Sequence, residues 1–184
     1  KNGQKLVGFG GPVPVTIIRA FDCVPFFFDT IPTRIASMED LCSRYIDETE
    51  KYAPTSMCAI DKAQLGVAIK HEFGVPVDAF VHATVPCDSS RIAYPIMERL
   101  YDCPTFTFDC PFRHDAKGFQ YVADQIQKFV GWMEEFTGLK WDAARDTEQF
   151  LRDQFGHDLL RAMGQVSGHG RFVHVYLNGL YWGL

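Results

Sequence analysis

Hydrophobic residues in this chain gather in short runs, and between the runs they recur at helical spacing. The runs predict strands over residues 5–9, 24–28, 79–85, 105–108 and 171–177. The run 79–85 is apolar almost throughout, which is typical of a central strand buried on both faces of a parallel sheet. We therefore expect a sheet at the centre of the molecule.

The segments between these runs carry apolar residues three or four positions apart, which predicts helices. The helices are expected over residues 15–20, 38–51, 56–73, 89–101 and 119–136, with a further helix from Asp142. Gly74 and Gly138 are expected to end two of them. Pro95 should kink its helix or mark its true start. Strands alternating with helices of this length predict an α/β fold with a doubly wound, mostly parallel sheet.

Length and charge narrow the class of protein. The 184 residues suffice for one substantial α/β domain, which we place at 1–163, with 164–184 as an unassigned tail or the start of a second α/β domain. The net charge is −5 and there is no basic stripe, so no nucleic-acid partner is expected. The longest apolar run, 24–28, is too short to span a membrane. The chain starts at Lys1 rather than at a methionine, which is consistent with a fragment.

Cysteine usage indicates a reducing compartment. The six cysteines form an even set, yet the chain shows no export signal and is longer than most disulfide-stapled domains. We therefore expect a cytoplasmic protein with reduced thiols. Cysteines in such proteins are packed, catalytic or bound to metal.

Cys58 and Cys87 are the strongest chemical candidates. Each stands where a strand or loop gives way to a predicted helix, and the first turn of a helix favours an anion such as a thiolate. Two thiolates converging from two such loops could hold an iron–sulfur cluster. The chain has no C-x-x-C pair here, and on spacing alone two packed, inert cysteines are the favoured interpretation.

Other polar residues have plainer interpretations. His82 lies within an apolar strand and is expected to be a core histidine. Asp115 could pair with His114 in acid–base chemistry, but it also fits the start of a helix. Ser89 is expected to cap a helix, as is Ser90. Arg91 suits either a phosphate or an acid at the sheet edge.

Two further motifs are weak. The run Gly8-Phe9-Gly10-Gly11 follows the pattern of a phosphate loop only in part, so a plain turn is expected. Cys110 follows a strand, but the adjacent Pro111 favours a packed turn over a ligand.

Four segments in order carry a resemblance to a known family. They are Pro12-Val13-Pro14-Val15 with Ala20-Phe21-Asp22-Cys23-Val24-Pro25, Ser56-Met57-Cys58-Ala59, Pro86-Cys87-Asp88, and Phe106-Thr107-Phe108-Asp109-Cys110-Pro111 before a long helix. In this order the segments are similar to the N-terminal part of a subunit of the 2-hydroxyacyl-CoA dehydratase and benzoyl-CoA reductase family. The resemblance covers roughly residues 5–145.

The resemblance implies two flavodoxin-like α/β domains, of the Rossmann-like three-layer kind, with a 4Fe–4S cluster between them. Cys58 and Cys87 match two of the family's three cysteine ligands, and the third belongs to a second domain outside this chain. It also implies a homologous second subunit, a separate ATP-dependent iron–sulfur activator protein, and a CoA-thioester substrate. The chemistry would be single-electron delivery to the thioester, which allows dehydration through a ketyl radical.

Two alternatives remain open from the sequence. The related aryl-CoA (benzoyl-CoA) reductase would use the same cluster on another substrate. A non-catalytic α/β scaffold domain would simply pack its cysteines. The family often carries acidic residues on the first helix, where this chain has Val15-Thr16, and residues 164–184 match no family pattern. Both departures leave the acyl substrate open.

Overall fold

The computed structural model describes residues 3–142 except Phe73, Pro86 and His114, together with two short strands near the C-terminus. The elements are β1 (Leu6–Gly10), α1 (Val15–Ala20), β2 (Val24–Phe27), α2 (Thr30–Ile35), α3 (Glu39–Thr49), α4 (Ala59–Ile69), β3 (Ala79–Ala83), α5 (Ser90–Tyr101), β4 (Thr105–Phe108), α6 (Ala116–Thr137), β5 (Tyr176–Leu177) and β6 (Leu180–Tyr181). They divide into two compact units, Lys1–Val13 with Cys23–Gln125, and Pro14–Asp22 with Ile126–Leu184.

The first unit is built on a four-stranded sheet in the order β2-β1-β3-β4. Every neighbouring pair of strands is parallel, with Phe9 beside Phe27, Gly10 beside His82, and Ala83 beside Phe108. The order places β1 and β3 at the centre, although a strand and several helices separate them in the chain. The expected doubly wound parallel sheet is thus confirmed, and the order is that of flavodoxin-like folds.

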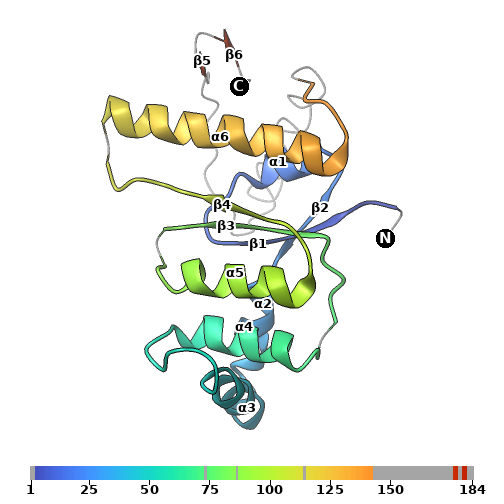
Figure 1. Cartoon of the computed structure of the whole chain (residues 1–184), viewed down its shortest axis with the longest axis vertical. Coiled ribbons are helices and arrows are strands. Elements are labelled where there is room, and N and C mark those ends of the chain that lie inside the picture. Colours follow the sequence, from blue (N-terminus) through green and yellow to red (C-terminus); the bar gives the residue numbers. More distant parts are fainter. Residues whose placement is uncertain are drawn as a thin grey trace, which may run out of the picture. The chain divides into compact units, whose positions relative to one another are not determined.

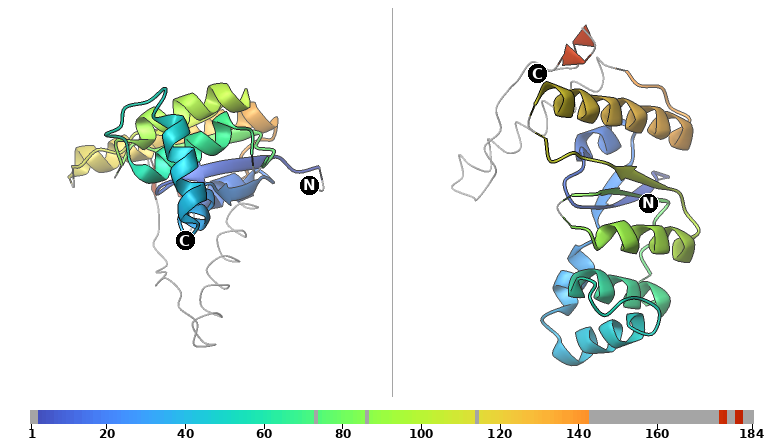
Figure 2. Two further views of the ribbon diagram at one scale, coloured as in Figure 1. Left: turned by 90° about the horizontal axis from the view of Figure 1, so that it is seen from below. Right: turned by 60° about the vertical axis from the view of Figure 1, so that its left-hand side comes forward.

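Helices cover both sides of this sheet. α5 packs against β3 and β4, α4 packs against α5, and α3 packs against α4. Figure 1 shows α5, α4 and α3 at increasing distance from the sheet, and the right-hand view of Figure 2 shows the same succession. The first part of α6 belongs to this unit and lies on the opposite side of the sheet (Figure 1). The arrangement is the three-layer α/β fold that the sequence predicts.

Interlocked aromatic rings form the core between the sheet and α5. Phe80 of β3 is fully buried and meets Phe28, Tyr94 and Tyr101 edge to face, with ring centroids 5.1, 5.7 and 5.3 Å away. Edge-to-face pairs align the positive edge of one ring with the negative face of the next. Two of the phenylalanines in the sequence, Phe28 and Phe80, thus form part of this core.

The second unit contains α1 and the last turns of α6. Phe129 and Met133 of α6 are fully buried, as is Ile18 of α1. The ring of Phe21 lies 5.8 Å from that of Trp141. Strands β5 and β6 pair antiparallel, with Tyr176 beside Tyr181. Among the helices in the described part of the chain, none combines the length and apolar character needed to cross a membrane.

Several predicted boundaries hold and others are wrong. α1 and β4 match the predicted residues, and α6 ends before Gly138 as expected. α4 ends at Ile69 rather than at Gly74, and Pro95 lies inside α5 instead of marking its start. Helix α2 was not predicted. The helix expected from Asp142, most of the strand expected at 171–177, and the boundary at residue 163 lie outside the described residues.

Candidate functional site

A cavity of about 210 Å³ opens at the carboxyl edge of the sheet. It lies beside the ends of β1 and β3 and the first turns of α4 and α5. It is lined by Gly10, Gly11, Asp29, Cys58, Ile60, Asp61, Ala83, Val85, Cys87, Ser90 and Tyr94. Both cysteines singled out from the sequence are among these residues, so the fold brings together two thiols that lie far apart in the chain.

The topology explains why a cavity forms here. From β1 the chain reaches β2 on one side, and β3 then takes the other side of β1. Connections leave in opposite directions at this point, which opens a crevice outside the carboxyl ends of the two central strands. Ligands of doubly wound folds bind in such crevices, and this cavity lies in that position.

Cys58 sits at the N-cap position of α4, directly before its first residue, Ala59. Its thiol is exposed, and its backbone N–H donates a hydrogen bond to Oγ of Ser89 over 3.1 Å. Ser89 is the N-cap residue of α5, but its side chain makes no cap hydrogen bond, so the predicted capping role of its hydroxyl is wrong. The hydroxyl instead ties the loop before α5 to the loop before α4.

Cys87 lies half-buried in the loop between β3 and α5. Its Sγ is 3.7 Å from Oδ2 of Asp61, close enough for a weak S–H···O hydrogen bond. The Ser90 hydroxyl donates a hydrogen bond to the backbone carbonyl of Cys87 over 2.7 Å and so stabilises the same loop. Cys87 is therefore fixed from two sides, by a carboxyl group on α4 and by a hydroxyl on α5.

Two carboxyl groups and a phenol form the polar part of the cavity. Asp61, in the first turn of α4, is 5% exposed, and Asp29 follows β2. The Tyr94 hydroxyl lies 3.4 Å from Oδ1 of Asp29. Burial, and then the negative charge of Asp61, raise the pKa of Asp29. Burial raises the pKa of Tyr94 well above its usual value, so its phenol stays protonated and can donate.

Gly10 lines the cavity, and His82 packs against Tyr94, which also lines it. A Cβ at Gly10 would lie 2.0 Å from the Tyr94 hydroxyl, so only glycine allows the phenol to reach this position. The glycine run thus ends a strand and makes room for a tyrosine, in agreement with the interpretation as a turn. His82 is 1% exposed, stacks on Tyr94, and lies 2.9 Å from the Thr107 hydroxyl. This confirms the predicted core histidine.

A hydrogen-bonded network braces the neighbouring end of β4. Asp109 accepts hydrogen bonds from Thr84 over 2.9 Å and from the Tyr121 hydroxyl over 2.6 Å. These hydrogen bonds lower the pKa of Asp109. Arg91 lies 3.6 Å from the same carboxylate, which selects the sheet-edge acid from its two expected partners. The backbone N–H of Cys110 donates to Thr84, as a packed turn would.

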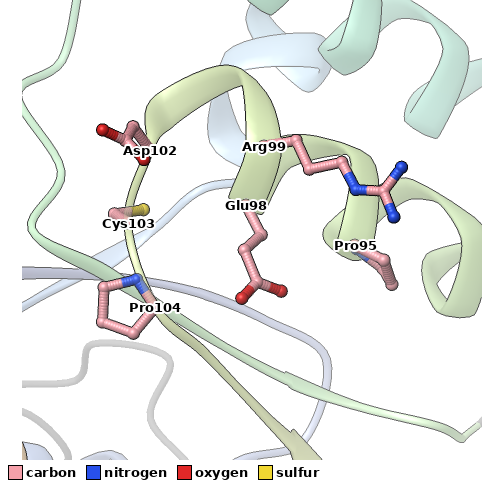
Figure 3. Close-up of a pocket in the computed structure, with 6 residues that line it drawn as sticks. All are labelled: Pro95, Glu98, Arg99, Asp102, Cys103 and Pro104. Atoms are coloured by element: carbon pink, nitrogen blue, oxygen red, sulfur yellow. The ribbon is translucent and has the colours of Figure 1, made fainter.

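A second, more open cavity of about 560 Å³ lies at the opposite edge of the sheet, before β4. Figure 3 shows Glu98 and Arg99 extending in different directions from α5, with Cys103 to the left on the segment that leaves the helix. Burial raises the pKa of Cys103 to about 11, so its thiol stays protonated at neutral pH. Ligands of doubly wound sheets bind at the carboxyl edge, and this cavity lies at the other one.

Asp115 lies at the start of α6, where the sequence allows either a helix cap or an acid–base pair with His114. Its Oδ1 accepts a hydrogen bond from the backbone N–H of Gly118 over 2.9 Å, which is the geometry of a helix N-cap. Its other carboxylate oxygen pairs with Arg113. The expected role at the helix start is confirmed. The alternative pairing with His114 lies outside the described residues.

The donor set fits part of a cluster site. Thiolates are the usual ligands of iron–sulfur clusters, and the cavity presents two cysteine side chains from the loops that precede α4 and α5. Within the described ranges, no group of three or more histidine, cysteine, aspartate or glutamate side chains is placed to hold a metal ion. Two thiols alone do not complete a cluster site.

Sequence reasoning missed Asp29, Asp61 and Tyr94. The position of Asp61 could have been predicted, because an acidic residue three positions after Cys58 falls in the first turn of the same helix. Asp29 lies two residues after the end of β2, at the edge of the sheet where ligands bind. Tyr94 gave no signal, because it occupies an ordinary apolar position of α5.

A protein-family model matches most of the chain. Residues 12–166 match the family model described as 2-hydroxyglutaryl-CoA dehydratase, D-component. The match includes Cys58, Cys87 and the residues around them. No curated protein matches the chain.

Proposed function

The chain belongs to the 2-hydroxyglutaryl-CoA dehydratase D-component family, and from that premise we propose that it is a cluster-holding subunit of a 2-hydroxyacyl-CoA dehydratase. One observation carries the proposal: Cys58 and Cys87 line a single cavity at the carboxyl edge of the sheet. The two thiols would bind a 4Fe–4S cluster, with the remaining ligand supplied from outside the described residues. When bound, the cluster would supply single electrons and a Lewis-acidic iron.

The chain's own residues prepare the thiols for that role. Each thiol must lose its proton to bind iron. Asp61 stands 3.7 Å from Sγ of Cys87, where its carboxyl group accepts a weak hydrogen bond and orients the sulfur. The hydrogen bond from Cys58 to Ser89 keeps the two loops together before any ligand arrives. The side chains of Ile60 and Val85 give the cavity part of its apolar lining.

The proposal includes partners of three kinds. A homologous second subunit would share the reaction, an ATP-dependent iron–sulfur activator would deliver electrons, and a CoA thioester would be the substrate. Dehydration is favoured over aryl-CoA reduction because the matching family is described as a dehydratase. Assays with 2-hydroxyacyl-CoA and aryl-CoA substrates distinguish the two. The cytoplasmic location stays a prediction from cysteine usage.

Iron loading tests the proposal directly. The full chain, purified without oxygen and reconstituted with iron and sulfide, should bind both and absorb visible light through sulfur-to-iron charge transfer. Cys58→Ser and Cys87→Ser should each lose most of the iron. Cys42→Ser on α3 is the matched control, and it should keep the iron. A colourless wild type, or equal loading of all four proteins, would rule the proposal out.

A further inference from the structure

Lys62 is a buried lysine that lies on α4, four residues after Cys58. Its side chain is only 9% exposed, and lysine is almost never buried to this extent unless its ammonium group is paired. Its Nζ lies 2.5 Å from Oε1 of Glu50 and donates a hydrogen bond to the backbone carbonyl of Thr55 over 2.9 Å. Both partners belong to the Cys58 loop, residues 50–58, which connects α3 to α4.

The contact with Thr55 lies at the centre of an exposed stretch of the Cys58 loop. Met57, near the end of the loop, is buried in the core, whereas residues 54–56 are exposed. Nζ of Lys62 therefore ties the exposed stretch to α4 three residues before Cys58. The ion pair with Glu50 ties the start of the same loop to the same ammonium group. One side chain thus connects two points of the loop to the helix that follows it.

The ammonium group favours one position of this loop. Hydrogen bonds from a charged donor are stronger than those between neutral groups, and water competes poorly for a donor that is nearly buried. A displaced loop would leave the ammonium group without its partners in surroundings of low dielectric, which is costly. The backbone of Lys62 is itself held, because the Thr49 hydroxyl donates to its carbonyl over 2.6 Å. The position of the loop is therefore set from a fixed point on α4.

We propose that Lys62 is a positioning residue for Cys58, and that its ion pair with Glu50 keeps the thiol at the cavity before any ligand binds. The inference rests on the proposed function, in which Cys58 binds iron. Ser89 holds the backbone N–H of Cys58 from the side of α5, and Lys62 acts on the same loop from the side of α4. A site held in place in advance loses less conformational freedom on binding, which favours retention of iron.

Hydrogen exchange at the end of the loop measures this role on the iron-free full chain. The N–H of Met57 donates to the carbonyl of Pro54, and that of Cys58 donates to Ser89, so both amides report opening of the loop. In Lys62→Met both should exchange about tenfold faster by NMR, the factor expected for one lost charge-assisted hydrogen bond.

Two further variants complete the exchange experiment. Glu50→Gln keeps the shape of the partner and removes its charge, and it should accelerate exchange of the same two amides by about threefold. Lys70→Met is the matched control, because it removes another ion pair between α4 and α3, with Glu48 at 3.0 Å, at the far end of α4. It should leave exchange at Met57 and Cys58 at the wild-type rate.

Iron release measures the consequence for the proposed site. After reconstitution with iron and sulfide, Lys62→Met should lose iron to a chelator about threefold faster than the wild type. Lys70→Met should lose it at the wild-type rate. The comparison separates positioning of the thiol from a general loss of stability, since both variants remove an ion pair from the same two helices.

Equal exchange of the two amides in wild type, Lys62→Met and Glu50→Gln would overturn the inference, as would the same acceleration in Lys70→Met. Faster exchange with an unchanged rate of iron release would also overturn it, because Lys62 would then hold the loop without affecting the site. A wild type that takes up no iron overturns the proposed function instead. In that case the exchange rates still decide whether Lys62 fixes the position of Cys58.

Discussion

The backbone N–H of Cys58 donates to the hydroxyl of Ser89, 31 residues further along the chain. The bond crosses from the start of α4 to the start of α5, so the spacing of the two cysteine loops depends on one serine side chain. The sequence predicts that the Ser89 hydroxyl caps a helix. In the structure it instead acts as a clamp, a hydrogen bond that holds the two loops together.

Ser89→Ala should loosen this clamp. The lost hydrogen bond should lower the free energy of unfolding by about 1 kcal/mol, the usual net value for such a bond. We also expect faster loss of iron from the reconstituted protein, because the two loops are no longer held together. Ser89→Thr keeps the hydroxyl and is the control. Urea denaturation and the rate of iron release to a chelator measure both effects, and identical release rates in Ala and wild type would contradict the role.

At Gly66, the backbone of α4 lies close to the backbone of α3. A Cβ at this position would lie 2.1 Å from the backbone oxygen of Tyr45, so Gly66→Ala must push the helices apart. We expect a loss of about 2 kcal/mol or more in the free energy of unfolding. Gly131→Ala on α6 meets nothing within 4 Å and should stabilise by up to about 1 kcal/mol. Chemical denaturation of the two variants should therefore give opposite signs.

His82 predicts a pH dependence of stability. Burial lowers its pKa from 6.5 to about 4. Between these two pH values His82 is therefore protonated in the unfolded chain and neutral in the folded one. Stability should fall as pH decreases from 6.5 towards 4, with a slope of at most about 1.4 kcal/mol per pH unit from this residue. His82→Phe keeps a ring against Tyr94 and should flatten the slope. Urea denaturation between these pH values tests this, and parallel curves for the two proteins would refute it.

Cys103 should be the least reactive of three thiols compared at pH 8. Its pKa of about 11 keeps it protonated, and its side chain is buried. Cys58 is exposed and Cys87 is half-buried at the mouth of the cavity. Brief treatment of the iron-free chain with iodoacetamide, followed by mass spectrometry, should label Cys58 and Cys87 well before Cys103. In urea the three should react at similar rates.

The sequence predicts the sheet well because each central strand is a continuous apolar run. The run from Ala79 to Ala83 forms β3 with every residue buried, which is typical of a strand in the interior of a parallel sheet. Helix ends were harder to predict. α4 ends before His71, which adopts a positive φ of 53°, while the backbone N–H of Glu72 bonds the carbonyl of Val67. This is a Schellman motif without glycine. Because glycine is the usual residue at such a position, the sequence predicts that α4 ends at Gly74 instead.

The site was half predictable for a related reason. Thiols attract attention by their chemistry, and the resemblance places Cys58 and Cys87 in the right motifs. Whether they meet depends on the order in which β1 and β3 enter the sheet, which no local pattern records. Asp29 comes from a third strand end, beside an unpredicted helix whose Pro32 obscures its helical pattern. Tyr94 reaches the cavity only because Gly10 lacks a side chain.

Tyr94, which lines the cavity, belongs to a cluster of edge-to-face rings: Phe80 meets Phe28, Tyr94 and Tyr101, and Phe28 also meets Tyr101. Rings held in this way have few other orientations. In the proposed function, a rigid support of this kind would keep the reorganisation energy of single-electron transfer low, and it follows from packing that the fold requires in any case.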